Sequence, residues 1–501
     1  MVELTGMAAA ALHRAVVRRE VTAREVVDAH IAQIERVNAA INAVVVRRFA
    51  EARREADALD TALARGEADG ALSGVPITVK ESFDLEGFAS TAGLTARAQT
   101  RARQDAVAVA RLRAAGAIVL GKTNVPTLLL ANESDNPLYG RTSNPWDTSR
   151  APGGSSGGEA AIIAAGGSPL GLGSDIGGSV RLPAHACGIH SLKPGSGIVP
   201  LEGHLQFSVA TPALRIAVGP LARSVTDLAL AMSVLAGASA RVRNGIAGLR
   251  IGFFTDNGVI TPSPAVRRAV REAAAALAAR GAHVDEWQPP DSEEAWDLYV
   301  RLMYADGMAK AREALRGSQV DLRTRQLVDP GAMPPALLEW SGAMMALAGQ
   351  RHFAKAIARL RRLDDAGLAE VLAQRDACRR RFLDSLELAR LDAIVCPPDA
   401  LPALPHGSSP YLADALSYCA LFNLLDMPAG VVSTTHVAPG EESDRGSSID
   451  GVVMAASWAE RGSAGLPVGV QVAARESRED VVLAVMRALE PDTMLFPPAR
   501  P

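Results

Sequence analysis

Residues 151–200 are so rich in glycine that they constrain the fold of this chain more than any other segment. They contain 13 glycines, whereas 44 glycines in 501 residues correspond to between four and five in any fifty. Such enrichment requires a backbone that approaches another group closely or adopts positive φ. Apolar residues at 160–165 separate the glycines and must be buried somewhere, which argues against a flexible Gly/Ser linker.

Two further interpretations of this stretch fail on spacing. A Walker-type phosphate loop would need lysine and then serine or threonine after the glycines, and a dinucleotide fingerprint starting at Gly171 meets Ile176 in place of its third glycine. The nucleophile-elbow pattern GxSxG occurs at Gly154, Ser156 and Gly158. A polar, proline-containing sequence precedes it, whereas such an elbow follows an apolar strand, so we interpret this match as accidental.

Composition excludes several classes of protein. The 52 basic and 55 acidic residues give a formal charge of −3, which is not the basic footprint of a nucleic-acid-binding protein. Hydrophobic residues make up 48% and charged residues 21%, as in globular proteins. The four cysteines are far apart, and no CxxC or HExxH occurs, so we predict buried free thiols, no metal and no cofactor. Lacking a leader sequence or a long apolar run, the protein is expected to be soluble and cytoplasmic.

Short apolar runs alternate with helical patterns in both halves of the chain. In the helix expected at 22–38, Thr22 is the predicted N-cap and Glu25 completes a capping box. The polar tract 439–450 is expected to be a loop. This alternation predicts an α/β fold, with a single large mixed β-sheet core flanked by helices in one domain over residues 1–501. Strands are expected at 75–79, 117–120, 249–254, 393–396, 430–433 and 468–472, and further helices at 4–19, 106–115, 224–236, 263–280, 368–390 and 480–489.

Four separated motifs occur in a characteristic order. GVPITVKESFD contains Lys80, GKTN and NPW follow at 121–124 and 144–146, GGSSGG contains Ser155, and GSDIGGSVRLP contains Ser179, with 179 − 155 = 24. This arrangement resembles the amidase signature family of serine hydrolases. Strings such as NPLYG at 136–140 and LPVGVQV at 466–472 resemble its fatty acid amide hydrolase branch. Two departures are Ser191 and Gly195, where the family usually has glycine and threonine; the membrane-spanning N-terminal helix of the animal enzymes is also missing.

The resemblance implies a catalytic triad. Ser179 would be the nucleophile, and Ser155, preceded by a cis peptide bond to Gly154, would relay protons between Ser179 and Lys80. A lysine acts as a base only when neutral, which requires burial or cationic neighbours that lower its pKa. Lys80 ends an apolar run at 75–79, where burial is expected; taken alone, it would be interpreted as a solvated surface charge.

The resemblance also implies an oxyanion hole, formed by backbone N–H groups of Ile176, Gly177, Gly178 and Ser179. Paired glycines leave room for several amides to converge on one oxygen. The neighbouring residues 175 and 181, an aspartate and an arginine, are expected either to orient this loop or to form a plain structural salt bridge. Ser156, the residue at 174 and the nine histidines are interpreted as structural.

The substrate side is less defined. The resemblance places Leu129 beside the nucleophile as a pocket wall, although an ordinary core leucine fits equally well. The Met- and Leu-rich segment 333–349 is interpreted as core, as a lid or as a membrane contact. We expect a catalytic core at about 60–240 and a helical cap at about 295–390. With Glu339 as the only charge in these pocket segments, an apolar substrate is predicted.

The predicted function is therefore an amidase that hydrolyses an apolar acyl or aryl carboxamide through an acyl-serine intermediate. One alternative is the glutaminase subunit of a tRNA-dependent amidotransferase, whose usual SLDQxGP string is replaced here by ALRIAVGP at 213–220. Another is an inactive binding protein with the same fold. The expected partner is a small-molecule amide; a homodimer and a peripheral membrane contact both remain open.

Overall fold

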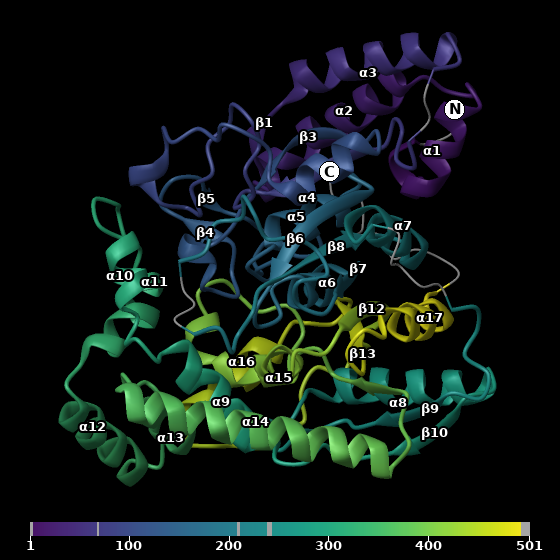
Figure 1. The fold of residues 1–501 in the computed structure, drawn as a ribbon. Coiled ribbons are helices and arrows are strands. Elements are labelled where there is room, and N and C mark those ends of the chain that lie inside the picture. Colours follow the sequence, from purple (N-terminus) through teal and green to yellow (C-terminus); the bar gives the residue numbers. More distant parts are fainter. Residues whose placement is uncertain (1–3, 68–69, 208–210, 238–242, 492–501) are drawn as a thin grey trace.

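An 11-stranded mixed sheet organises the computed structural model, which describes residues 4–67, 70–207, 211–237 and 243–491 (Figure 1). This confirms the predicted fold class. The strands follow the spatial order β1-β3-β2-β6-β8-β7-β12-β13-β11-β9-β10. In that order they span Val44–Arg47, Ile118–Thr123, Pro76–Lys80, Leu170–Asp175, Ala217–Ala222, His190–Lys193, Ala429–His436, Pro467–Ala474, Ala393–Cys396, Arg250–Phe253 and His283–Glu286.

Helices cover both faces of the sheet because its strands point apolar side chains alternately to either side. On β3, Val119 belongs to one buried cluster, whereas Ile118 and Leu120 belong to another. The first cluster is covered by α4 (Val107–Ala114), α7 (Val225–Leu235), α8 (Pro264–Ala279) and α17 (Glu479–Leu489). The second is covered by α1 (Ala9–Val17), α2 (Ala23–Ile41), α3 (Phe49–Ala64), α5 (Gly157–Ala164) and α6 (Arg181–Cys187).

A long helical excursion packs beside the β9–β11 end of the sheet (Figure 1). It consists of α9 (Ser292–Met303), α10 (Ala309–Ala314), α11 (Leu322–Val328), α12 (Pro335–Leu347), α13 (Arg351–Arg359) and α14 (Asp365–Leu388). The helices α15 (Ser417–Leu424) and α16 (Gly451–Glu460) lie next to it. Buried side chains of α9, α14 and α15 form a third apolar cluster with β11.

The predicted helices and strands are present, with bounds shifted by a few residues. Thr22 and Glu25 form the predicted capping box at α2, and the tract 439–450 contains no helix or strand. The glycine-rich strand β6 was not predicted. Its glycines serve close packing: a Cβ on Gly171 would lie 2.0 Å from Glu159 Oε2 on α5.

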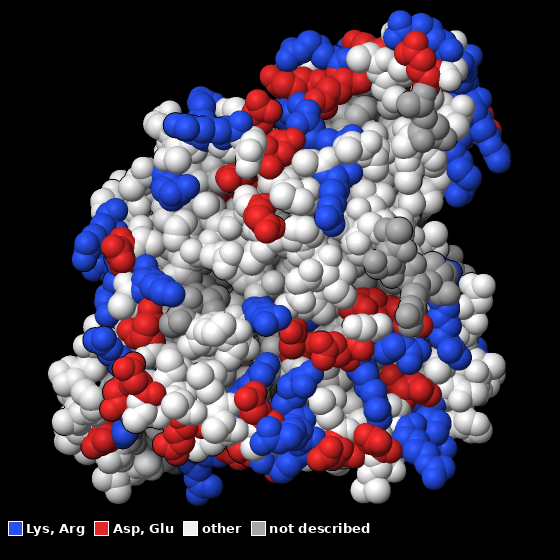
Figure 2. All heavy atoms as spheres, viewed as in Figure 1, with Lys and Arg blue, Asp and Glu red and all other residues white. Residues whose placement is uncertain are grey.

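The segment 333–349 is not core. On α12, Leu338 is buried, whereas Trp340 is 64% exposed and Leu347 is 83% exposed. Figure 2 shows that acidic and basic side chains are intermixed over the side of the molecule seen in Figure 1. In the part of the chain that the structure describes, no helix is long and apolar enough to cross a membrane.

Candidate active site

The parallel register of two neighbouring strands forms the centre of the site. Strand β2 ends at Lys80, and Val79 on β2 pairs with Leu172 on β6. The carboxyl ends of parallel strands meet at one edge of a sheet, so Lys80 faces Ser174 near the end of β6. Lys80 Nζ lies 3.0 Å from Ser174 Oγ and 3.2 Å from the Ser174 carbonyl oxygen. It lies 2.7 Å from Ser155 Oγ.

Burial gives Lys80 the protonation behaviour of a base. The side chain is fully buried, and this lowers its pKa from 10.5 to about 7, although the negative charges of Asp175 and Glu159 act in the opposite direction. Glu159 is itself buried, and its pKa is raised to about 8 despite hydrogen bonds from Thr78 and Thr123. Near neutral pH, a substantial fraction of Lys80 is therefore uncharged.

The two signature serines belong to segments that the backbone holds together. The N–H of Ser156 donates to the Ser179 carbonyl at 3.0 Å, and the Gly154–Ser155 peptide bond is cis. Ser155 is buried, whereas Ser179 is partly exposed. A small cavity of about 20 Å³ is lined by both serines together with Leu128, Leu129, Ser174 and Ile176.

The leucines of this wall have an unusual backbone. Leu128 and Leu129 both lie in the left-handed region, with φ of 58° and 62°. Such a conformation costs a non-glycine residue about 1–3 kcal/mol and concentrates at functional sites. The sequence treated core packing and a pocket wall as equal alternatives for Leu129. The structure places Leu129, only partly buried, in the wall of the cavity that Ser179 also lines.

The turn before Ser179 is held by a buried ion pair. Arg181 donates to Asp175 from Nη2 at 2.8 Å and from Nε at 3.0 Å, and both side chains are fully buried. Although burial alone would raise the pKa of Asp175, Arg181 holds it well below its usual range. Arg181 also binds the Cys419 carbonyl and Gln471. Asp175 also accepts hydrogen bonds from the N–H groups of Gly178 and Val180, so of the two alternatives the contacts favour a pair that orients the loop over a plain salt bridge.

Four backbone amides of this turn were expected to point at a developing oxyanion. The N–H of Gly178 donates to Asp175 Oδ1 at 2.8 Å. In the described part of the chain, the N–H groups of Ile176, Gly177 and Ser179 have no protein acceptor. Three of the four amides are therefore available to a ligand.

Two polar side chains beside the Lys80 amine were missed by sequence reasoning. Ser174, interpreted as a loop hydroxyl, contacts Lys80 directly. His204, interpreted as structural, lies with Nε2 2.9 Å from Ser174 Oγ and 3.0 Å from Ser82 Oγ. Since β6 was not predicted, its register with β2 could not indicate these contacts.

A second, larger cavity of about 330 Å³ is lined by the residues that follow the leucines of the first cavity in the chain. Leu130 and Ala131 line it, directly after Leu128 and Leu129 in the first cavity. Its other apolar walls come mainly from α9 and α13, with Trp296, Val300, Met303, Phe353, Ile357 and Leu360.

Two expectations about this pocket need correction. The segment 333–349 does not line either cavity near Ser179, because α12 lies outside α13. Arg359 and Asp414 line the larger cavity, so the prediction that Glu339 is the only fixed charge of the pocket is wrong. The two side chains lie 3.4 Å apart and are both buried. Their opposite charges partly cancel within an apolar wall.

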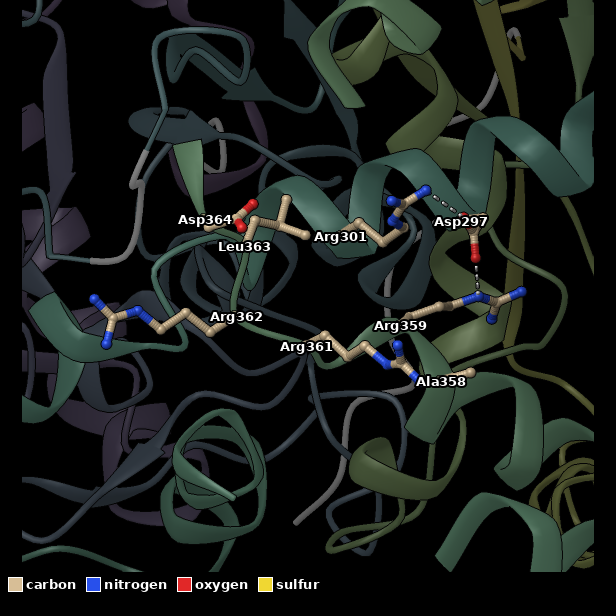
Figure 3. Close-up of a pocket in the computed structure, with 8 residues that line it drawn as sticks. All are labelled: Asp297, Arg301, Ala358, Arg359, Arg361, Arg362, Leu363 and Asp364. Carbon is tan, nitrogen blue, oxygen red and sulfur yellow. Dashed lines mark hydrogen bonds and ion pairs between the residues drawn. The ribbon is translucent and has the colours of Figure 1, made fainter. Parts of the chain in front are cut away.

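A third hollow, of about 540 Å³, is polar and lies on the other side of Arg359. Figure 3 shows that its arginines do not converge on one point. Arg301 and Arg359 turn toward Asp297, at 3.7 and 3.3 Å, and Arg362 points away from them. We assign no chemistry to this hollow. Among the described residues, no group of three or more His, Cys, Asp or Glu side chains is placed to hold a metal ion.

Comparison with known proteins agrees with this arrangement. The family model described as Amidase matches residues 25–483. Fatty-acid amide hydrolase 1 of Sus scrofa is 33% identical over 453 residues, covering 85% of this chain and 77% of that protein. Fatty acid amide hydrolase 1 of Caenorhabditis elegans is 32% identical over 440 residues, covering 84% and 76%.

The solved structure of a fatty acid amide hydrolase superimposes with a TM-score of 0.84 at 25% identity, covering 97% of this chain and 85% of that one. The similarity thus extends over the sheet, the signature motifs and the helical excursion. The chain belongs to the amidase signature family and is an amidase, a hydrolase that acts on amide bonds.

Proposed function

We propose that this amidase cleaves amides with an apolar acyl or aryl part, with Ser179 as nucleophile and Ser155 and Lys80 as its proton relay. The observation that carries the proposal is the position of Lys80, whose Nζ lies 2.7 Å from Ser155 Oγ and whose pKa burial lowers to about 7. A base is most effective when its pKa lies near the working pH.

In the first half of the reaction, Ser179 Oγ attacks the carbonyl carbon of the amide. Its proton passes to Ser155, and the Ser155 proton passes to neutral Lys80. The carbonyl electrons move to oxygen, where the free N–H groups of Ile176, Gly177 and Ser179 stabilise the negative charge; one such donor is typically worth about 3–4 kcal/mol. The Gly178 N–H, already donated to Asp175, holds the turn in shape.

Collapse of this intermediate breaks the carbon–nitrogen bond. Ser155 donates its proton to the leaving nitrogen and regains one from Lys80, which leaves an acyl ester on Ser179. Water then attacks the ester; its proton passes through Ser155 to Lys80 and returns through Ser155 to Ser179 Oγ as the ester bond breaks, which releases the carboxylic acid. Every proton that leaves a nucleophile is thus returned to a leaving group.

The cavity between α9 and α13 supports the choice of substrate. It offers about 330 Å³ and a mostly apolar wall. Each buried methylene contributes about 0.8 kcal/mol. Glutamine would have to desolvate an α-ammonium and a carboxylate there, which costs free energy unless both are paired. The relatives named as fatty-acid amide hydrolases support the same substrate class.

A hydrolysis screen tests this proposal against its alternatives. Long-chain acyl amides, hexanoyl amide and aryl amides should be hydrolysed with higher kcat/KM than acetamide or glutamine. Preference for glutamine would instead support the glutaminase alternative. Absence of turnover, together with absence of Ser179 labelling by a fluorophosphonate, would support an inactive binding protein.

We also propose that α12 makes a peripheral contact with a lipid surface. Its exposed apolar side chains support this, and they include Leu337, Trp340, Met344, Met345 and Leu347. Sedimentation with phosphatidylcholine vesicles tests it, and Trp340→Ser should weaken binding. A homodimer through this face would instead appear as a concentration-dependent mass. The buried free thiols support a reducing compartment such as the cytoplasm.

A further inference from the structure

A row of polar atoms extends from Lys80 to the far side of the small cavity. Lys80 Nζ lies 3.0 Å from Ser174 Oγ, and Ser174 Oγ lies 2.9 Å from His204 Nε2. Ser82 Oγ lies 3.0 Å from the same nitrogen. All four side chains are buried, and none of the roles proposed above uses His204 or Ser174.

The number of N–H donors on Lys80 changes with its protonation state. As an ammonium, Lys80 has three N–H donors, and three acceptors surround it: Ser155 Oγ, Ser174 Oγ and the Ser174 carbonyl oxygen. As a neutral amine it has two donors and one lone pair. The lone pair must face Ser155 to accept its proton, so both hydrogens must point at Ser174.

Ser174 can accept from Lys80 in both states only if its own hydroxyl proton is donated elsewhere. Its carbonyl cannot take that proton, and the available acceptor is His204 Nε2. If Ser174 instead donated to neutral Lys80, it would occupy the lone pair that should receive the Ser155 proton. Ser174 would then compete with Ser155 for the lone pair of Lys80.

We propose that His204 is a positioning residue, whose Nε2 accepts a hydrogen bond from the Ser174 hydroxyl and thereby keeps the Lys80 lone pair directed at Ser155. The inference rests on the proposed role of Lys80 as base. It requires the neutral tautomer that carries its proton on Nδ1, leaving Nε2 as an acceptor.

The surroundings of His204 fix the orientation of its ring and keep the ring neutral. Its ring packs edge-on against Phe83, with centroids 4.7 Å apart, which fixes the direction of Nε2. Burial, and then the charge of Lys80, lower the pKa of His204 to about 3, so the ring stays neutral. Nδ1 is buried and has no protein partner in the part of the chain that the structure describes. In the proposed tautomer Nδ1 carries an N–H without a protein acceptor, a cost that the hydrogen bonding at Nε2 must offset.

Two substitutions of His204 form a matched pair. Gln places an acceptor where Nε2 was, so His204→Gln should keep most of the activity. Asn is shorter and reaches only the Nδ1 position, so His204→Asn should lower kcat about tenfold or more with little change in KM. Ser82→Ala removes the other hydroxyl at Nε2 and serves as a control that should leave the pH profile in place.

The pH profile separates this role from a structural one. Without an acceptor at His204, the Ser174 hydroxyl can donate to neutral Lys80 but not to its ammonium, which favours the neutral form. The acid limb of kcat/KM should therefore move to lower pH in His204→Asn while the plateau falls. Asp175 on β6 and Glu159 on α5 are the ionisable groups that act on Lys80, and neither is changed in these variants.

The decisive measurement is a double-mutant cycle. In a Ser174→Ala background no hydroxyl competes for the lone pair, so His204→Asn should cost much less than in the wild type. Equal costs in both backgrounds, an acid limb that stays or moves to higher pH, or a Gln variant no better than Asn would overturn the inference. If Lys80→Ala kept wild-type activity, the proposed function itself would fail, whatever His204 does.

Discussion

The hydroxyl of Tyr299 touches the turn that carries Ser179, the proposed nucleophile. It donates to the Ile176 carbonyl at 3.3 Å, and a Cβ added to Gly177 would lie only 2.2 Å from it. Tyr299 belongs to α9 and also lines the larger cavity. The wall of the larger cavity and the turn before Ser179 are therefore in direct contact, and a glycine at 177 allows this close approach.

Gly177→Ala should lower kcat/KM by about tenfold or more, since overpacking of this kind typically costs 1–3 kcal/mol. Tyr299→Phe in the same chain should restore part of the loss, because the nearest ring atom would then be 3.2 Å from the new Cβ. Kinetics of the two single variants and the double variant measure this coupling. Independent, additive losses would contradict it.

Ser179→Ala and Lys80→Ala should each lower kcat by at least about a thousandfold, because members of such a relay act as one unit. Mass spectrometry should show no acyl-enzyme in Ser179→Ala. The matched control is Ser156→Ala, the serine of the rejected elbow pattern, which should retain most activity. The opposite result for Ser156 and Ser179 would restore the elbow interpretation.

Activity should rise with pH through about 7, the pKa of buried Lys80. The direction of this pH dependence follows from the role of Lys80 as a base. Because its pKa is lowered from 10.5 to about 7, the amine is mostly neutral, and able to accept a proton, above about pH 7. A pH profile of kcat/KM measures the limb. Lys80→Arg should abolish it, because a guanidinium stays charged at every accessible pH.

Arg181→Met should destabilise the fold by about 3–5 kcal/mol, because it leaves the Asp175 charge buried without its partner. Glu339→Gln breaks the surface ion pair between Glu339, which is 57% exposed, and Arg361, which is 45% exposed. This change should lower the free energy of unfolding by no more than about 1 kcal/mol. Urea unfolding of both variants measures the difference. Equal losses would mean that the buried pair has no special role.

Ile357→Trp should shorten the longest acyl chain that the enzyme accepts, since Ile357 on α13 lines the larger cavity. In the wild type, kcat/KM should rise about three- to fourfold per methylene until the pocket is full, in line with 0.8 kcal/mol for each. The plateau should come earlier in the variant. Leu388→Trp, at the exposed end of α14, is the control that should leave the series unchanged.

Sequence reasoning found the fold class and six of the eleven strands of the large sheet, because the signals of these strands were local. Thr22 and Glu25 are three residues apart, and their capping box formed as predicted. Strands such as β11 and β13 are short apolar runs with little ambiguity. In contrast, the sequence of β6 is typical of a loop. Its glycines are needed because Glu159 and other side chains of neighbouring elements pack closely against them, and local propensity does not indicate such contacts.

The motifs by themselves determined the family and the site residues that we propose: Lys80, Ser155 and Ser179 stand in strings whose order and spacing are specific. Only the tertiary structure decided what surrounds them. The register of β2 against β6 brought Ser174 to Lys80, and the segment after β7 returned His204 to the same place. The structure also placed α13, and not α12, in the pocket wall. These contacts join residues far apart in the chain, so they depend on strand order and helix packing, which no local pattern specifies.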